Sequence, residues 1–81
     1  MKLCVRFYSQ FRDLAGGSGF DVDLAEGTIV SDLLEQIYVK APALRPHDKS
    51  ILIGAGLEFV DRNYKLQAGD EISIMPPVQG G

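Results

Sequence analysis

One amphipathic helix set between strand-like segments is the feature that most constrains how this chain folds. Within residues 28–41 the apolar side chains recur at helical spacing: Ile29, Val30, Leu33, Leu34, Ile37 and Tyr38. A stripe of this kind favours packing against another layer of structure. We expect Thr28 to cap the start of this helix. Pro42 ends it, because the residue before a proline avoids the helical conformation.

Strand periodicity precedes this helix. Residues 2–8 alternate apolar and polar side chains, and residues 19–24 do the same. Alternation of this kind predicts strands with one face on the core, and the two segments lie close enough in the chain to pair as a hairpin. A short helical turn over residues 10–15 is expected between them, with Ser9 as its N-cap and Gly16-Gly17 as its end.

The second half of the chain carries shorter strand signals. Residues 51–53 predict an apolar strand that Gly54-Ala55-Gly56 interrupts, and residues 57–60 predict a brief edge segment. Residues 71–75 predict the last strand, and a proline pair then ends its pairing. The segments between these elements are predicted as polar connectors or turns: residues 43–50, 61–63 and 66–70.

The order of these elements predicts the fold class. A helix that joins the second and third strands, with the first and last strands in one sheet, indicates an α+β fold of β-grasp (ubiquitin-like) topology. We expect a mixed sheet of four to five strands with one main helix packed across it. The expected division is a β-grasp domain over residues 1–75 and a flexible tail over residues 76–81, because 81 residues suit one small domain.

Composition excludes several classes of function. The net charge of −3 and the lack of a Lys/Arg cluster argue against nucleic acid as a partner. No apolar run reaches the roughly 18 residues of a membrane span, and the N-terminus lacks the apolar core of a signal peptide. The single cysteine, Cys4, excludes an internal disulfide and indicates a reducing compartment. We therefore expect a cytoplasmic protein.

The C-terminal segment is the strongest candidate for chemistry. Two terminal glycines bury no side chain and cost the most backbone entropy to order, so they suit a tail that threads a narrow channel. The carboxylate of Gly81 is then the reactive group, and Gly80 allows its passage. Pro76 and Pro77 favour an extended exit of the tail. A frayed chain end is the alternative interpretation.

A second candidate is a docking surface on the outer face of the sheet. Several residues there do not belong to an obvious inner stripe, and aromatic, Arg and Met side chains are enriched in interfaces. We expect a partner-binding surface formed by Arg6, Tyr8, Phe59, Met75, Pro76, Pro77 and Val78. Packing of Phe59 in the core is an equally good interpretation of that residue.

Other residues give weaker signals. Cys4 is interpreted as a small apolar strand residue rather than a relay thiol, because no basic cluster is visible near it. His47, the single histidine, is interpreted as a loop residue, and no metal site is predicted. The glycines at residues 16–19 are interpreted as a hairpin connector, since no phosphate-loop lysine follows them. Asp21 and Asp23 are interpreted as the solvated face of a strand.

The C-terminal residues Met75-Pro76-Pro77-Val78-Gln79-Gly80-Gly81 resemble a family ending of the form "PPV, any residue, GG". Residues 59–66 with 69–72, and residues 5–8 with 11–14, are similar to the same family. The chain thus resembles the small, sulfur-carrying subunits of molybdopterin synthase, within the ubiquitin-like β-grasp sulfur carriers. Many members carry an asparagine in the turn where this chain has Gly54-Ala55-Gly56, and both residue types tolerate positive φ.

The resemblance implies a mechanism and a set of partners. An adenylating enzyme of the ubiquitin-activating type uses ATP to adenylate Gly81, and a sulfur donor converts it to a thiocarboxylate. The tail then enters the large synthase subunit, in a heterotetramer of two small and two large subunits. There it donates sulfur for the dithiolene of molybdopterin. The catalytic side chains are implied to lie on the large subunit, with no cofactor bound permanently to this chain, which is not an enzyme on its own.

Three alternatives stay open. The same tail suits a sulfur carrier for thiamine, cysteine or tRNA thiolation, and it also suits a ubiquitin-like modifier whose Gly81 ends in an isopeptide bond. Thiamine-pathway carriers and ubiquitin generally lack the double proline, which favours the molybdopterin branch. The third alternative is a non-covalent interaction module with an inert tail.

Overall fold

The fold is a five-stranded mixed sheet with helices on one of its faces. The computed structural model describes residues 1–77. The strands follow the order β2-β1-β5-β3-β4 in the sheet, and their bounds are β1 Lys2–Phe7, β2 Gly19–Asp23, β3 Leu52–Ala55, β4 Glu58–Val60 and β5 Glu71–Met75. The helical elements are α1 Gln10–Ala15, α2 Val30–Lys40 and the 3₁₀ helix η1 Pro42–Ser50. The predicted β-grasp arrangement is confirmed.

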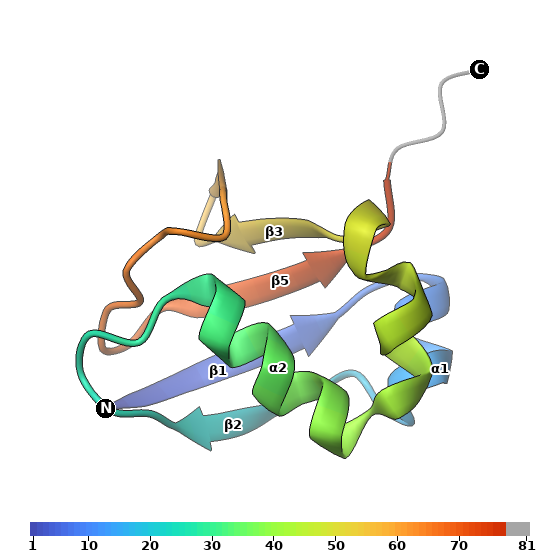
Figure 1. Ribbon diagram of the computed structural model, residues 1–81, viewed down its shortest axis with the longest axis horizontal. Helices are drawn as coiled ribbons and strands as arrows, with labels where there is room; N and C mark the ends of the chain where they lie inside the picture. Colours follow the sequence, from blue (N-terminus) through green and yellow to red (C-terminus); the bar gives the residue numbers. More distant parts are fainter. Residues whose placement is uncertain (78–81) are drawn as a thin grey trace.

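The first and last strands lie side by side at the centre of the sheet. β1 pairs with β5 in parallel, with Val5 opposite Ile72, and Figure 1 shows the two arrows running in the same direction. The other pairings are antiparallel: β1 with β2, β3 with β5 and β3 with β4. The end of β5, from which the tail leaves, therefore lies beside the end of β1.

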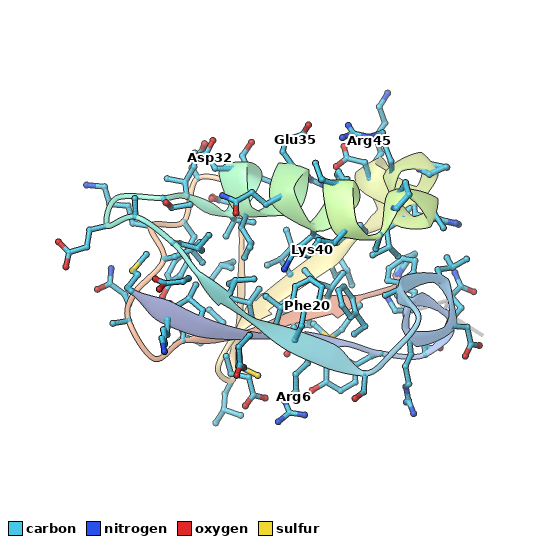
Figure 2. The ribbon with its side chains drawn as sticks, turned by 90° about the horizontal axis from the view of Figure 1, so that it is seen from below. Arg6, Phe20, Asp32, Glu35, Lys40 and Arg45 are labelled. Atoms are coloured by element: carbon cyan, nitrogen blue, oxygen red, sulfur yellow. The ribbon has the colours of Figure 1, made fainter. Side chains whose placement is uncertain are left out.

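The two faces of the sheet differ. Figure 2 shows α2 and η1 on one side of the sheet and Arg6 on the other, pointing away from the helices. The core fills the space between sheet and helices, and no polar or charged residue is buried in it within residues 1–77. Burial of each large apolar side chain contributes about 1.5–3 kcal/mol. The core residues from α2 are Val30, Leu33, Leu34, Ile37 and Tyr38.

The starts of the two α-helices differ from prediction in their caps. α2 begins after Ile29 rather than Thr28, and the Thr28 hydroxyl instead donates to the Ala25 carbonyl oxygen at 2.6 Å. The α1 bounds match the prediction, but the Ser9 hydroxyl makes no capping bond. Ser9 has a φ of 55°, whereas capping residues usually have extended backbone. Gly16 ends α1 with the left-handed conformation expected of it.

Two predictions in the second half of the chain were wrong. Residues 43–50, predicted as a polar connector, instead belong to the 3₁₀ helix η1, because Leu44 is fully buried and anchors that segment on the core. Gly54 does not interrupt the strand: β3 continues through it, with Phe59 and Ser73 as its cross-strand neighbours. The turn falls at Gly56, whose φ is 62°. No helix within residues 1–77 is long and apolar enough to cross a membrane.

Candidate functional site

The sheet face opposite α2 carries the outer-face residues that the sequence singled out. The strand register places Arg6 opposite Ser73, Ser73 opposite Gly54, and Gly54 opposite Phe59. These four residues form one row across β1, β5, β3 and β4, since paired residues in adjacent strands share a face of the sheet. Figure 2 shows Arg6 projecting from this uncovered side. The structure thus brings together residues that are far apart in sequence.

A shallow hollow lies along this row, which we name the Gly54 notch. Its volume is about 270 Å³. The lining residues are Tyr8, Gly54, Gly56, Leu57, Glu58, Phe59, Ser73 and Met75. Phe59 is 71% exposed and Leu57 is fully exposed. Large apolar side chains left in water beside a hollow are typical of a binding surface, and the core interpretation of Phe59 is therefore wrong.

Met75, the last residue of β5 before the C-terminal tail, forms one wall of the notch. β5 ends at Met75, and the backbone N–H of Tyr8 donates to the Ile74 carbonyl oxygen at 3.2 Å. This bond holds Tyr8 beside the end of β5. Pro76 is half-buried and Pro77 exposed, and neither belongs to a strand, as proline chemistry predicts. Val78, Gly80 and Gly81 lie outside the described residues.

Arg6 lies on the same face but outside the notch. Its Nε is 3.6 Å from Glu71 Oε1, and both side chains are about half exposed. An exposed pair of this kind contributes about 0–1 kcal/mol, because solvent screens it. The guanidinium is therefore weakly held and accessible to a carboxylate on another molecule.

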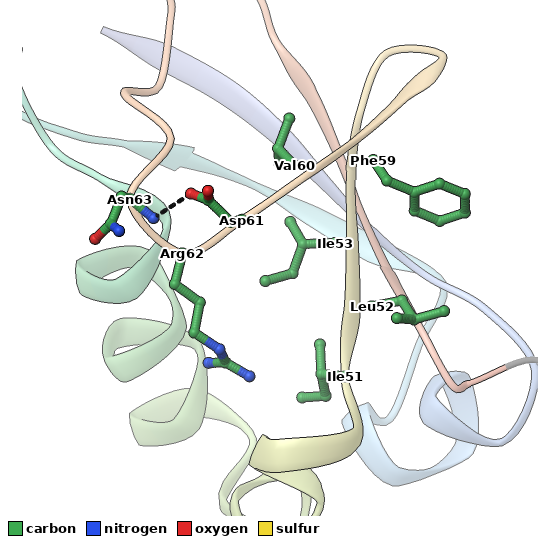
Figure 3. Close-up of a pocket in the computed structure, with 8 residues that line it drawn as sticks. All are labelled: Ile51, Leu52, Ile53, Phe59, Val60, Asp61, Arg62 and Asn63. Atoms are coloured by element: carbon green, nitrogen blue, oxygen red, sulfur yellow. Dashed lines mark hydrogen bonds between the residues drawn. The ribbon is translucent and has the colours of Figure 1, made fainter.

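A larger open groove of about 640 Å³ lies where β3 and β4 diverge. Figure 3 shows Leu52 and Phe59 on one side of β3, and Ile53, Val60 and Arg62 on the other. The floor is mostly apolar. Asp61 Oδ1 accepts a hydrogen bond from the Asn63 backbone N–H at 2.8 Å, which fixes the turn that closes the groove. The Asp61 carboxylate thus already has a partner within the chain.

Arg62 belongs to a polar cluster that joins three segments. Asp48 in η1 accepts hydrogen bonds from the Tyr38 hydroxyl and from Arg62 Nη1, the latter at 3.1 Å. The hydrogen bond from Tyr38 lowers the pKa of the Asp48 carboxyl, and the positive charge of Arg62 lowers it further. Burial, together with Asp48, raises the pKa of the Tyr38 hydroxyl. The Asp48 carboxylate and the Arg62 guanidinium are paired with each other within the cluster. The role of the cluster is therefore to hold η1 and the 61–64 turn to α2.

The described residues offer little chemistry of their own. Within residues 1–77 no group of three His, Cys, Asp or Glu side chains is placed to hold a metal ion. Cys4 is half-buried in β1 with Asp21 and Glu71 as its cross-strand neighbours. His47 packs its ring 5.5 Å from the ring of Phe11.

Sequence reasoning missed five residues of the notch: Gly54, Gly56, Leu57, Glu58 and Ser73. Ser73 lies between two core isoleucines of β5, so strict alternation already places it on the outer face. Gly54 was assigned to a turn because glycine is common there, although its backbone is regular strand. Leu57 carries no sequence signal, because its exposure depends on where the β3–β4 turn falls.

Comparison with known proteins identifies relatives over the whole chain. A model described as the ThiS family matches residues 5–81. The chain is 34% identical over 83 residues to the molybdopterin synthase sulfur carrier subunit of Chlamydomonas reinhardtii, covering 100% of both chains.

Solved structures share the same fold. The structure of small archaeal modifier protein 1 from Haloferax volcanii superposes with a TM-score of 0.87 at 25% identity, covering 100% of both chains. A chain from the complex of subunits 1 and 2 of the molybdopterin-converting factor of Helicobacter pylori superposes with a TM-score of 0.71 at 26% identity, again covering 100% of both chains. The family resemblance drawn from the sequence is confirmed.

Proposed function

This chain belongs to the ThiS family, and from that premise we propose that it is a sulfur carrier, the small subunit of a molybdopterin synthase. The observation that carries the proposal is the end-to-end match to a relative named as a molybdopterin synthase sulfur carrier subunit. The Gly80-Gly81 ending after a proline pair supports it, because that tail presents an unhindered carboxylate.

In the proposed mechanism the Gly81 carboxylate attacks the α-phosphate of ATP on an adenylating enzyme, and pyrophosphate leaves. The product is an acyl-adenylate. A sulfur donor then displaces AMP, so that one sulfur atom replaces one carboxylate oxygen and a thiocarboxylate results. The tail carries this sulfur into the large synthase subunit for the molybdopterin dithiolene. This chain supplies the Gly81 carboxylate, and the large subunit supplies the catalytic side chains.

We propose that the large subunit docks on the outer face of the sheet and on Met75 and Pro76, where the tail begins. Tyr8, Phe59 and Met75 line one hollow beside Pro76, so a partner that takes in the tail lies against them. Arg6 supplies a loosely held cation on the same face. The Helicobacter pylori structure, a complex of subunits 1 and 2, supports a partner of this kind. The assembly we propose has two small and two large subunits.

The test is the intact mass of the protein after incubation with ATP, a sulfur source and a matching adenylating enzyme. We expect a species heavier by the difference between one sulfur and one oxygen atom, located in the Gly81 peptide. Deletion of Gly81, or addition of one residue after it, should abolish both this species and rescue of molybdoenzyme activity in cells lacking their own carrier. Rescue by the chain without Gly81 would refute the proposal.

A ubiquitin-like modifier is the second candidate, favoured by the likeness to small archaeal modifier protein 1 of Haloferax volcanii. Both functions need adenylation of Gly81, and they differ in what displaces AMP. A modifier yields an isopeptide bond to a lysine of another protein, whereas a carrier yields a thiocarboxylate. Hydroxylamine-resistant conjugates in cells, with no thiocarboxylate detected, would favour the modifier.

A further inference from the structure

The Gly54 notch has the form of a socket for one side chain. We propose that it receives a single apolar side chain projecting from the protein that takes in Gly81, which the proposed function identifies as the large synthase subunit. Gly54 and Ser73 are then the residues that determine which partner surfaces fit. This inference rests on the proposed function, and it adds the docking element and its residues.

Gly54 keeps the floor of the notch empty. A Cβ at this position would lie 3.3 Å from Met75 Cε and 3.5 Å from Ser73 Cβ, so any side chain here would fill the space between them. The backbone of Gly54 is regular strand and does not require glycine. Glycine weakens a strand interior and often marks a place where another group approaches closely. The missing side chain at Gly54 therefore leaves the space that a side chain of the partner can occupy.

The walls of the notch specify an apolar occupant. Phe59 and Leu57 project into solvent on one side, and Met75 lies on the other. Among the lining residues the single formal charge is that of Glu58, which disfavours a phosphate or a carboxylate. An open hollow with aromatic and aliphatic walls suits the kind of anchor side chain that dominates many interfaces.

The length of the tail identifies the molecule that supplies this side chain. Six residues run from Pro76 to Gly81, and an extended chain spans at most about 3.3–3.6 Å per residue, or about 20 Å in total. A protein that encloses Gly81 must therefore begin within about 20 Å of Met75. Because Met75 is itself a wall of the notch, the notch lies within the area that the surface of that protein can cover.

The first test fills the notch. Ser73→Leu places a large side chain on the outer face without altering the core, and we expect it to weaken binding of the large subunit by at least about tenfold in calorimetric titration. Gly54→Ala should weaken it less, since Met75 Cε is the flexible end of its side chain. Ser31→Leu makes the same change at an exposed position of α2 and should leave the affinity unchanged.

The second test observes the notch directly. The chain has two methionines, so methyl-labelled protein gives one signal from Met75 and one from Met1, at the opposite end of β1. Addition of the large subunit should shift the Met75 methyl signal and leave that of Met1 in place. The Ser73→Leu variant should lose this shift while its melting temperature stays within a few degrees of wild type.

The outcomes separate the two proposals. If wild type and Ser73→Leu bind the large subunit equally and Gly81 still becomes a thiocarboxylate, the notch proposal is overturned and the carrier function stands. If Gly81 is never converted, the carrier function fails, whatever the notch binds. If the wild-type chain does not bind the large subunit at all, the notch proposal also fails, because its occupant is then absent.

Discussion

At the scale of single residues, Asp48 is the point where three segments of the chain meet. Its carboxylate accepts from Tyr38 of α2 and from Arg62 of the 61–64 turn. The pKa of this carboxyl is lowered in the folded protein. A carboxylate with a lowered pKa stabilises the fold above its unfolded pKa of about 3.9, and this contribution is lost as the pH falls through the lower, folded value.

Asp48→Asn should therefore reduce the free energy of unfolding at pH 7 by about 1 kcal/mol, a value kept small because the site is half exposed and screened by solvent. The difference between the two proteins should shrink as the pH falls below about 4. Urea unfolding at several pH values measures this. Glu26→Gln removes a carboxylate from an exposed residue that has no ion pair within the described part of the chain, so it is the matched control for the loss of one acidic group.

At the scale of elements, the start of α2 is held by another segment of the chain. Its start is capped from outside: the N–H groups of Val30 and Ser31 donate to the carbonyl oxygens of Tyr64 and Arg62, at 3.1 Å and 2.9 Å. These bonds satisfy groups that a helix leaves free at its first turn. The 61–64 turn thus replaces the side-chain cap expected from Thr28 and ties the helix to the region of the groove.

The inner and outer surfaces of α2 should respond differently to the same kind of truncation. Leu33 is fully buried, whereas Val39 is 80% exposed. Leu33→Ala should lower the free energy of unfolding by about 2–5 kcal/mol, because it leaves a cavity. Val39→Ala should change it by less than about 0.5 kcal/mol. Denaturant unfolding of both variants checks the placement of the helix, and a large loss for Val39→Ala would contradict it.

At the scale of the whole molecule, the core lies on one side of the sheet, and the other side is the face on which we propose that the large subunit docks. A ligand that binds the folded state alone stabilises it by about 2.7 kcal/mol at a concentration of 100 times its Kd. We expect the large subunit to raise the melting temperature of this chain. Phe59→Ala should leave the unbound melting temperature unchanged, since Phe59 is 71% exposed, and should reduce the rise caused by the large subunit. A drop in the unbound value would contradict the docking interpretation.

Much of the fold follows from local sequence patterns. The alternation in residues 2–8 and 71–75 and the helical stripe after residue 29 reflect side-chain periods of about two and 3.6 residues, which are properties of the backbone itself. The segments that were misjudged have weak local signals. Residues 43–50 read as a loop because Pro46 and polar residues dominate them, yet burial of the single Leu44 orders the segment as η1.

The sequence by itself determined the element order, the apolar face of each element and the proline-glycine tail, because these depend on residue type and spacing along the chain. The tertiary structure alone decided which outer-face residues meet. Pairing of β1 with β5 and of β5 with β3 brings Tyr8, Met75 and Gly54 to one notch. The register of these strands acts between residues 17 to 67 positions apart in the chain, so the composition of that notch cannot be read from any one segment.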